Sequence, residues 1–507
     1  MRPADLGYDL FVVTASILII PIKTYQNFIA GRFVSSDEGE TINVINPATE
    51  EVISQVPETP LEQVREAIAA AESAQQSWGR LPAIQRAGHL RRIAQKIRER
   101  TELLVRVIAE EQGKTLALAQ VEVNFTADYI DYMAEWARRL EGEIVTSDRP
   151  NENIFLFRAP IGVIAGILPW NFPFFLIARK LAPALVTGNT IVIKPSEETP
   201  NNAFEFAKIV AETDLPPGVF NLVSGFGSTV GNELTRSRKV GMVSFTGSVE
   251  TGSRIMAAAA MNITKVNLEL GGKAPAIVMA DADLDLAVQA VKNSRVINSG
   301  QVCNCVERVY VQRSVADEFS NKLAQAMKQT RFGDPLRDRD IDFGPLINRA
   351  GVEKVEALVR GAVKAGATVL TGGKRGDRDK GFWYEPTVLT GCKQEMEIIQ
   401  KEIFGPVAPI VTFEDLDEAI AFANDSDYGL TSSLYTSDIN VAMRASNELR
   451  FGETYINREN FEAMQGYHAG WRKSGIGGAD GKHGLYEYTQ THMVYLQYDA
   501  KSNGSKK

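Results

Sequence analysis

Residues 163–193, VIAGILPWNFPFFLIARKLAPALVTGNTIVI, combine two apolar strands with a helix between them. The run 163–168 is predicted to be a buried strand. Residues 174–186 have a helical pattern that stops before Gly188, a residue suited to a helix C-terminus. Residues 190–193 form the second strand. A strand, a helix and a strand in this order indicate a parallel sheet with helices on its faces.

The same alternation continues on both sides of this stretch. Helices and strands are expected in turn at 200–210, 219–223, 227–234, 242–245, 248–260 and 266–270. A second α/β region extends to about residue 457 and begins with elements at 284–296, 308–312 and 315–327. Apolar residues three or four positions apart predict earlier helices that cover a sheet, with Leu61, Val64, Ile68 and Ala71 in one and Leu90, Ile93 and Ile97 in another. The fold class is therefore α/β, and ligands of such sheets bind beyond the carboxyl ends of the strands.

Two segments depart from this alternation. Residues 143–158, EIVTSDRPNENIFLFR, are predicted to form a hairpin that interrupts the first region. Near the end of the chain, MVYLQY at 493–498 is predicted to be a lone strand. Because a lone strand leaves its backbone groups unpaired, we expect 143–158 and 487–498 to form a small sheet that pairs between subunits.

Composition narrows the classes of protein that fit. The 507 residues, 44% apolar and 23% charged, are typical of a globular protein of two or three domains. A net charge of -8 without a basic stripe disfavours nucleic acid as a partner. Three cysteines are a poor disulfide framework and fit a reducing compartment, so we expect a cytoplasmic protein. None of the four histidines has the spacing of metal ligands, and no metal site is expected.

The two ends of the chain differ from its body. Residues 10–20, LFVVTASILII, are apolar but too short to span a bilayer, and Asp5 and Asp9 stand where a signal peptide has basic residues. We interpret 1–22 as an N-terminal extension, disordered or a start-site artefact, with a membrane or targeting segment as the alternative. No membrane association is expected. Residues 499–507 are predicted to be a disordered polar tail.

Three polar residues at predicted strand ends and loops are candidates for catalysis. Cys303 in INSGQVCNC lies on a loop, where a thiolate nucleophile and a buried small side chain are both plausible. Glu269 in VNLELGGKAP ends a strand; burial would raise its pKa and suit it to general-base work, and the alternative is a surface acid. Asn171 in ILPWNFPFF is an amide among apolar neighbours, able to stabilise an oxyanion or simply to form a turn.

Together these motifs resemble those of the aldehyde dehydrogenase superfamily. PWNFPF (169–174), LELGGK (268–273) and GQVC (300–303) occur in order, and three further segments agree: IVIKPSEETP (191–200), SFTGSVETG (244–252) and EIFGPV (402–407). The resemblance covers about residues 25–498. Within the superfamily the chain is most similar to lactaldehyde and glycolaldehyde dehydrogenases, through SGQVCNC, FGETYINRENFEAMQG (451–466) and HAGWRKSGIGGADGKHG (468–484).

The resemblance implies a fold and a reaction. The expected aldehyde dehydrogenase fold has a Rossmann-like NAD-binding domain (23–142 and 159–268), an α/β catalytic domain (269–475) and a small β oligomerisation arm (143–158 and 487–498). A homodimer or homotetramer is expected. By resemblance, Cys303 attacks the aldehyde carbon, and the Asn171 side chain and the Cys303 backbone N–H hold the oxyanion. After hydride transfer to NAD, Glu269 activates the water that hydrolyses the thioester.

The resemblance also implies the cofactor site. Lys194 would bind the adenosine ribose, and Glu197 would accept from the 2′-hydroxyl and repel a 2′-phosphate, which favours NAD over NADP; the alternative for Glu197 is a solvated loop acid. Ser248 begins a helix suited to the pyrophosphate. Glu402 would hold the nicotinamide ribose, and Phe404 would lie against the ring. The same site is assigned Leu168, Trp170, Ser196 and Gly227. GFGSTVG (225–231) has one residue too many for the usual dinucleotide fingerprint.

Four polar residues are candidates for binding the substrate: Arg179, Asn304, Glu462 and His468. They suit a small hydroxyaldehyde, because an apolar tail would leave them unpaired. The alternatives are a salt-bridged helix surface residue for Arg179 and a structural loop residue for His468. The predicted activity is NAD-dependent oxidation of a small 2-hydroxyaldehyde, such as lactaldehyde or glycolaldehyde, to the acid.

Four other interpretations of the activity remain open. The enzyme could act on another small aldehyde or a semialdehyde. A CoA-acylating relative is disfavoured because Glu269 is present. An inactive scaffold is disfavoured because Cys303, Glu269 and Asn171 are all present. A cysteine hydrolase is disfavoured because no histidine stands in a recognisable pairing context.

Overall fold

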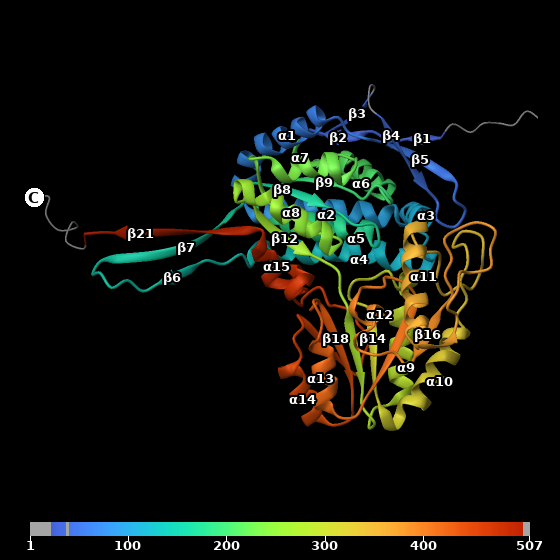
Figure 1. Cartoon of the computed structure of the whole chain (residues 1–507). Coiled ribbons are helices and arrows are strands. Elements are labelled where there is room, and N and C mark those ends of the chain that lie inside the picture. Colours follow the sequence, from blue (N-terminus) through green and yellow to red (C-terminus); the bar gives the residue numbers. More distant parts are fainter. Residues whose placement is uncertain (1–21, 37–39, 500–507) are drawn as a thin grey trace, which may run out of the picture.

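The computed structural model describes residues 22–36 and 40–499. Two sheet-centred bodies stand one above the other, and a long arm of strands projects to one side (Figure 1). The predictions for residues 1–21 and for the tail from residue 500 lie outside the described residues. Among those described, no helix is long and apolar enough to cross a membrane.

The upper body is built on an eight-stranded sheet in the order β20-β12-β11-β8-β9-β10-β2-β3. Its parallel centre consists of β8 (Val163–Ile167), β9 (Thr190–Lys194), β10 (Phe220–Leu222), β11 (Val240–Thr246) and β12 (Lys265–Glu269). Antiparallel strands flank it, namely β2 (Asn27–Ile29), β3 (Arg32–Val34) and β20 (Gly475–Ile476). Every residue of β8 and β9 is buried, as expected for a parallel sheet covered on both faces.

Helices cover this sheet. They are α1 (Leu61–Arg80), α2 (Ala83–Glu99), α3 (Thr101–Gln112), α4 (Leu116–Glu135), α5 (Pro173–Val186), α6 (Asn201–Ala211), α7 (Asn232–Arg236) and α8 (Val249–Ala259). The stripe predicted in α1 is buried at Val64, Ile68 and Ala71. Helix α5 begins with Pro173, whose fixed φ suits the first turn, and all of its residues are buried. One predicted helix differs, because residues 227–231 form a π-helix before α7.

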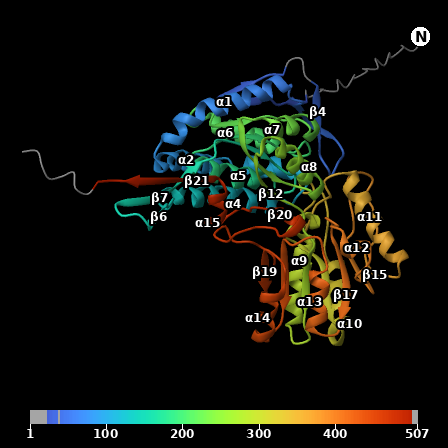
Figure 2. The same cartoon turned by 60° about the vertical axis from the view of Figure 1, so that its left-hand side comes forward.

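The lower body contains a seven-stranded sheet in the order β15-β16-β17-β14-β13-β18-β19. Its strands are β13 (Ala274–Val278), β14 (Val306–Gln312), β15 (Thr368–Thr371), β16 (Thr387–Thr390), β17 (Val407–Phe413), β18 (Thr431–Tyr435) and β19 (Glu453–Ile456). Its helices are α9 (Leu284–Val296), α10 (Ala316–Lys328), α11 (Arg349–Lys364), α12 (Glu397–Gln400), α13 (Leu416–Asn424) and α14 (Ile439–Glu448). The chain then returns to the upper sheet, where Gly475 of β20 pairs with Glu269 of β12. Figure 2 shows α11 and α12 at one edge of this body and α14 at the other.

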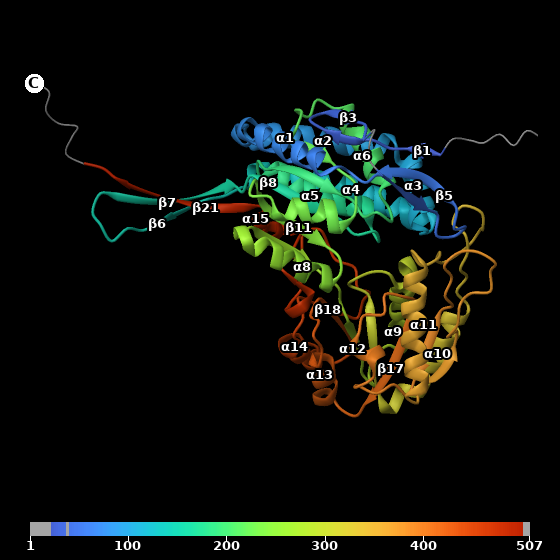
Figure 3. The ribbon, with the colours of Figure 1, turned by 45° about the horizontal axis from the view of Figure 1, so that its top comes forward.

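Two smaller sheets complete the fold. One joins β1 (Lys23–Thr24), β5 (Val52–Pro57) and β4 (Thr41–Ile45). The other is the arm, in which β7 (Glu152–Pro160) pairs with β6 (Glu143–Val145) and with β21 (Thr489–Gln497), the strand that follows α15 (Gly481–Glu487). The arm stands clear of both bodies in each view (Figure 1, Figure 3). The predicted final strand therefore begins earlier than residue 493 and pairs along its whole length within its own chain.

Candidate active site

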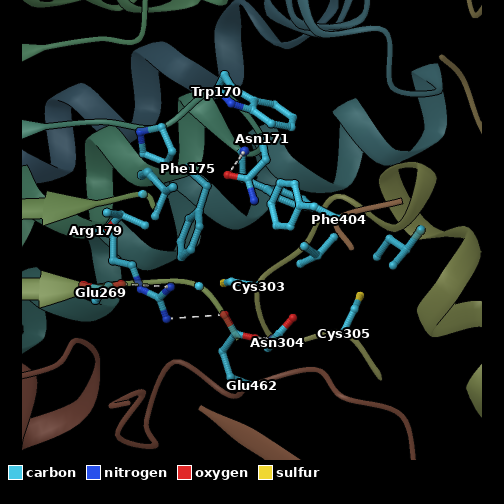
Figure 4. Close-up of a pocket in the computed structure, with 18 of the residues that line it drawn as sticks. Trp170, Asn171, Phe175, Arg179, Glu269, Cys303, Asn304, Cys305, Phe404 and Glu462 are labelled. Carbon is cyan, nitrogen blue, oxygen red and sulfur yellow. Dashed lines mark hydrogen bonds and ion pairs between the residues drawn. The ribbon is translucent and has the colours of Figure 1, made fainter. Parts of the chain in front are cut away.

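A pocket lies between the two bodies, and Asn171, Glu269 and Cys303 all line it (Figure 4). Asn171 follows β8, and Glu269 ends β12, two parallel strands on either side of β11. Cys303 comes from the loop between α9 and β14 of the lower body. The three candidates from distant parts of the sequence thus share one cavity at the carboxyl ends of strands, as expected for this class of sheet.

The loop that carries Cys303 is held rigidly. Asn298 and Ser299 both have positive φ, at 46° and 60°. The Ser299 hydroxyl donates to the Gly344 carbonyl at 2.8 Å, and the Gln301 side chain accepts from the Ile347 N–H at 2.9 Å. A Cβ at Gly272 would overlap the Cys303 carbonyl oxygen, which explains a glycine at that place in LELGGK. The backbone of Cys303 is therefore held in place, and the partly exposed residue lines the pocket.

The amide of Asn171 is oriented by the same loop. Its Nδ2 donates to the Gln301 carbonyl at 3.0 Å, and its Oδ1 accepts from the Phe172 N–H at 3.0 Å. A side-chain amide has two N–H donors, so one remains for an oxygen in the pocket. Sequence reasoning missed the pair behind it: Lys114 donates to the Asn171 carbonyl at 2.8 Å and also binds the buried Glu122. A fixed donor beside Cys303 is suited to stabilising an oxyanion.

Glu269 is buried among cations. Its Oε2 lies 3.6 Å from Nη1 of Arg179 and has no hydrogen-bond partner among the described residues. Burial alone would raise its pKa, but Lys180, Arg179 and His468 together hold the pKa below its ordinary value. The expectation of a raised pKa was therefore wrong, because it considered the apolar strand and not the charges around it. Glu269 is a carboxylate at neutral pH, able to accept a proton from water.

Three of the four predicted substrate residues, Arg179, Asn304 and Glu462, form one polar cluster. Arg179 of α5 donates through Nε to Asp480 at 3.0 Å and lies 3.3 Å from Glu462 through Nη2, and Asn304 donates to the other oxygen of Glu462. The contacts of Glu462 with Arg179 and with Asn304 link these three residues at the pocket wall, as Figure 4 shows. Arg179 is ion-paired but buried, so the helix-surface alternative is wrong.

His468 lies deeper, behind the pocket wall. Its Nδ1 is 2.8 Å from Glu453, and only 2% of the residue is exposed. Burial and Arg179 lower the pKa of His468, but Glu453 and the neighbouring Cys303 raise it, and the net shift is well above the ordinary value. The raised pKa favours the imidazolium form of His468, which lies near Cys303.

The opposite wall of the pocket is suited to a nucleotide. Trp170 and Phe404 meet edge to face with ring centroids 5.4 Å apart, and Ser248 and Glu402 also line the pocket. The Ser248 hydroxyl caps α8 by accepting from the Thr251 N–H at 3.2 Å. Glu402 accepts from the Gly272 N–H at 2.9 Å, burial raises its pKa, and a carboxylate has further acceptor sites for a ribose hydroxyl. These groups fit the nicotinamide half of a dinucleotide.

Five of the predicted cofactor residues lie outside the pocket lining. They are Leu168, Lys194, Ser196, Glu197 and Gly227. Lys194 ends β9 and is buried, with its Nζ 3.0 Å from the Pro195 carbonyl and 3.3 Å from Glu197. Glu197 is partly exposed, and its carboxylate is paired with Lys194. A lysine and a carboxylate at the end of the strand beside β8 can bind a ribose diol by donating to one hydroxyl and accepting from the other.

Comparisons with known proteins agree with this geometry. A model described as "Aldehyde dehydrogenase family" matches residues 33–494. Lactaldehyde dehydrogenase of Escherichia coli is 64% identical over 94% of this chain and 99% of its own length. The chain belongs to the aldehyde dehydrogenase family. A crystal structure of lactaldehyde dehydrogenase from E. coli has a TM-score of 0.93, covering 94% of this chain and all of that one.

The predicted family and its α/β fold are therefore confirmed, and this aldehyde dehydrogenase is an oxidoreductase acting on aldehyde groups. Its cofactor is a nicotinamide dinucleotide, NAD or NADP. A relative named D-glyceraldehyde dehydrogenase (NADP(+)) from Thermoplasma acidophilum is 38% identical over 94% of this chain and 96% of its own length. Among the described residues of the enzyme, no three His, Cys, Asp or Glu side chains are grouped to hold a metal ion.

Proposed function

We propose that this aldehyde dehydrogenase oxidises a small 2-hydroxyaldehyde, such as lactaldehyde or glycolaldehyde, to the carboxylic acid with NAD. The observation that carries the proposal is the polar cluster of Arg179, Asn304 and Glu462 beside Cys303 in a pocket whose other wall is aromatic. A substrate hydroxyl can form hydrogen bonds with this cluster. An apolar tail would exclude water from these polar side chains without giving them a hydrogen-bond partner. The name of the E. coli relative agrees with this substrate class.

The residues act in two stages. The Cys303 sulfur attacks the aldehyde carbon, and the oxygen that gains the electron pair accepts hydrogen bonds from Asn171 Nδ2 and the Cys303 backbone N–H. The dinucleotide, held by Trp170, Phe404, Ser248 and Glu402, would supply the hydride acceptor, and an acyl group would then remain on Cys303 as a thioester. Glu269 then removes a proton from water as the water attacks this carbonyl, and the carbon–sulfur bond breaks to release the acid and the thiolate.

We infer a preference for NAD over NADP from Glu197. Its carboxylate lies beside Lys194 at the end of β9, and the two side chains offer a donor and an acceptor for the ribose hydroxyls. A 2′-phosphate would bring a second negative charge close to Glu197, which opposes binding. The Leu168 N–H donates to the Lys194 carbonyl at 3.0 Å, and the Ser196 hydroxyl accepts from the Glu198 N–H at 3.3 Å, so both residues hold the end of β9 and its loop; the role of Gly227 at the cofactor stays a prediction.

We also propose that the arm joins a second copy of this chain. Strand β21 is an edge strand of nine residues, and its outer side leaves a row of backbone groups for another strand. Large apolar side chains on the arm are exposed, among them Ile144, Phe157 and Tyr495. Light scattering should give the mass of a dimer or tetramer, and replacing Tyr495 with proline should shift it toward the monomer. A monomeric wild-type protein would refute this arrangement.

The first experiment measures NADH formation with NAD and either glycolaldehyde or a long-chain aldehyde. Faster turnover of glycolaldehyde would support the proposal, with kcat/KM for it at least ~10-fold higher, since unpaired buried polar groups reject an apolar analogue. Turnover of the long-chain aldehyde alone would refute the substrate class but not the chemistry. A requirement for added CoA would indicate acyl transfer in place of hydrolysis. No turnover of any aldehyde would indicate an inactive scaffold.

A further inference from the structure

Asp480 has an unusual backbone for a residue with a side chain. Its φ is 71° and its ψ is 162°, a region that is occupied almost only by glycine. Glycine at this position would remove the strain, because it has no Cβ. Glycines do occur close by, at Gly477, Gly478 and Gly481. Only 2% of Asp480 is exposed. Strain of this kind persists where the surroundings hold the residue, and it is concentrated at functional sites.

The carboxylate of Asp480 does not cap the helix that follows it. Asp480 is the N-cap of α15, a position at which aspartate usually accepts a hydrogen bond from the first turn. Its side chain accepts none from α15, all of whose residues are described. Instead, Oδ1 accepts from Nε of Arg179 at 3.0 Å, and Oδ2 accepts from Nη2 of the same side chain. The carboxylate is thus committed to Arg179, 301 positions earlier in the chain.

This two-pronged contact fixes the plane of the guanidinium. With Nε and Nη2 engaged, Nη1 is directed toward Glu269, 3.6 Å from its Oε2. Phe175 lies against the guanidinium, 5.3 Å from ring centroid to carbon. Arginine and carboxylate form such paired hydrogen bonds with defined geometry, which a single contact lacks. Nη1 therefore lies beside Glu269 at the wall of the pocket that Arg179, Glu269 and Cys303 all line.

We propose that Asp480 is the positioning residue that sets specificity for the 2-hydroxyl, by holding Arg179 with Nη1 aimed at that group. Without Asp480, the carboxylates that remain paired with Arg179 are Glu269 and Glu462, and both line the pocket itself. Arg179 would turn toward them, and its free donors would no longer face the substrate. This inference rests on the proposed function, since it assumes that a hydroxyaldehyde is the substrate.

The test replaces Asp480 with glycine and with alanine. Both changes remove the carboxylate, but only glycine accepts the backbone without strain, so the alanine variant should have the lower melting temperature. Glycolaldehyde and acetaldehyde serve as a substrate pair that differs by one hydroxyl. Because kcat/KM reports the steps through acyl-enzyme formation, it is independent of the later work of Glu269. We expect both variants to lose at least ~10-fold in kcat/KM for glycolaldehyde and much less for acetaldehyde.

Every outcome of these kinetic measurements either supports or overturns the proposed role of Asp480. Equal losses of kcat/KM for both aldehydes would show a merely structural role and overturn the proposal. A loss found only in the less stable alanine variant would overturn it too, because both variants lack the carboxylate. Unchanged kinetics would also overturn it. Arg179→Lys provides a second measurement, because lysine keeps the charge without the fork. The double variant with Asp480→Gly should lose no more discrimination than either single variant, and additive losses would overturn the coupling. Failure of the proposed function is visible separately, in a wild-type enzyme that does not prefer glycolaldehyde.

Discussion

Replacing Glu269 with glutamine should leave the enzyme able to form the acyl group on Cys303 but slow to remove it. Glutamine keeps the shape of the side chain, and Oε2 of Glu269 has no hydrogen-bond partner to lose among the described residues. General-base catalysis contributes about 10²–10⁴-fold to a rate. Since three cations hold the pKa of Glu269 below its ordinary value, it is a weak base at neutral pH. We therefore expect a loss near the lower limit, about 10²-fold, or ~2.7 kcal/mol in the barrier.

The assay is rapid mixing of the variant with NAD and glycolaldehyde. NADH should appear in a burst equal to the concentration of active sites, followed by a steady rate about 10²-fold below that of the wild type. Mass spectrometry of the intact protein should detect the acyl group during the slow phase, with Cys303→Ala as the control that acquires none. A steady wild-type rate would refute the role of Glu269. A slow reaction with neither burst nor adduct would place its function before hydride transfer.

Three other changes test the rest of the site. Cys303→Ala should abolish NADH formation, because burial raises the pKa of the neighbouring Cys305 thiol to about 12 and keeps Cys305 from acting as the nucleophile. A variant as active as the wild type would exclude Cys303 as the nucleophile. Lys180→Met removes a cation that lowers the pKa of Glu269, so the acid limb of the deacylation rate should move to higher pH in single-turnover measurements. An unmoved limb would contradict the assigned charge effect. Glu197→Gln should raise kcat/KM for NADP relative to NAD, and an unchanged ratio would remove Glu197 from cofactor selection.

The sequence was sufficient to predict the strands of the two sheets and to select Asn171, Glu269 and Cys303 as candidates, for a physical reason. A parallel strand buried on both faces is a short continuous apolar run, and the residue after it lies at the carboxyl edge of the sheet. Asn171 and Glu269 stand at such positions, after β8 and at the end of β12. The loop of Cys303 was recognisable from its motif. Its approach to the other two depends on packing between the bodies, which the resemblance implied and the residues alone did not.

The charges around these residues could not be predicted in the same way. Lys180 sits next to Arg179 in an otherwise apolar helix, a signal that could have indicated a second buried cation. Asp480 lies in a glycine-rich loop far along the chain, and nothing in its neighbours indicates an arginine partner. Glu453 likewise shows no local sign of pairing with His468. Such contacts depend on tertiary structure, which also brings Lys180, Arg179 and His468 to Glu269, and the charges of these three residues reversed the direction expected for its pKa.

A general base in this site must be ionised and yet free to bind water, two requirements that usually conflict. A cation that hydrogen-bonds a carboxylate lowers its pKa but also occupies its lone pairs. Here the three cations that lower the pKa of Glu269 have their short hydrogen bonds elsewhere: Lys180 to Thr246, Arg179 to Asp480, and His468 to Glu453. Their charges act on Glu269 through space, while its buried Oε2 has no hydrogen-bond partner among the described residues. In the proposed mechanism, Asp480 and Glu453 would support hydrolysis by holding Arg179 and His468 in hydrogen bonds away from Glu269.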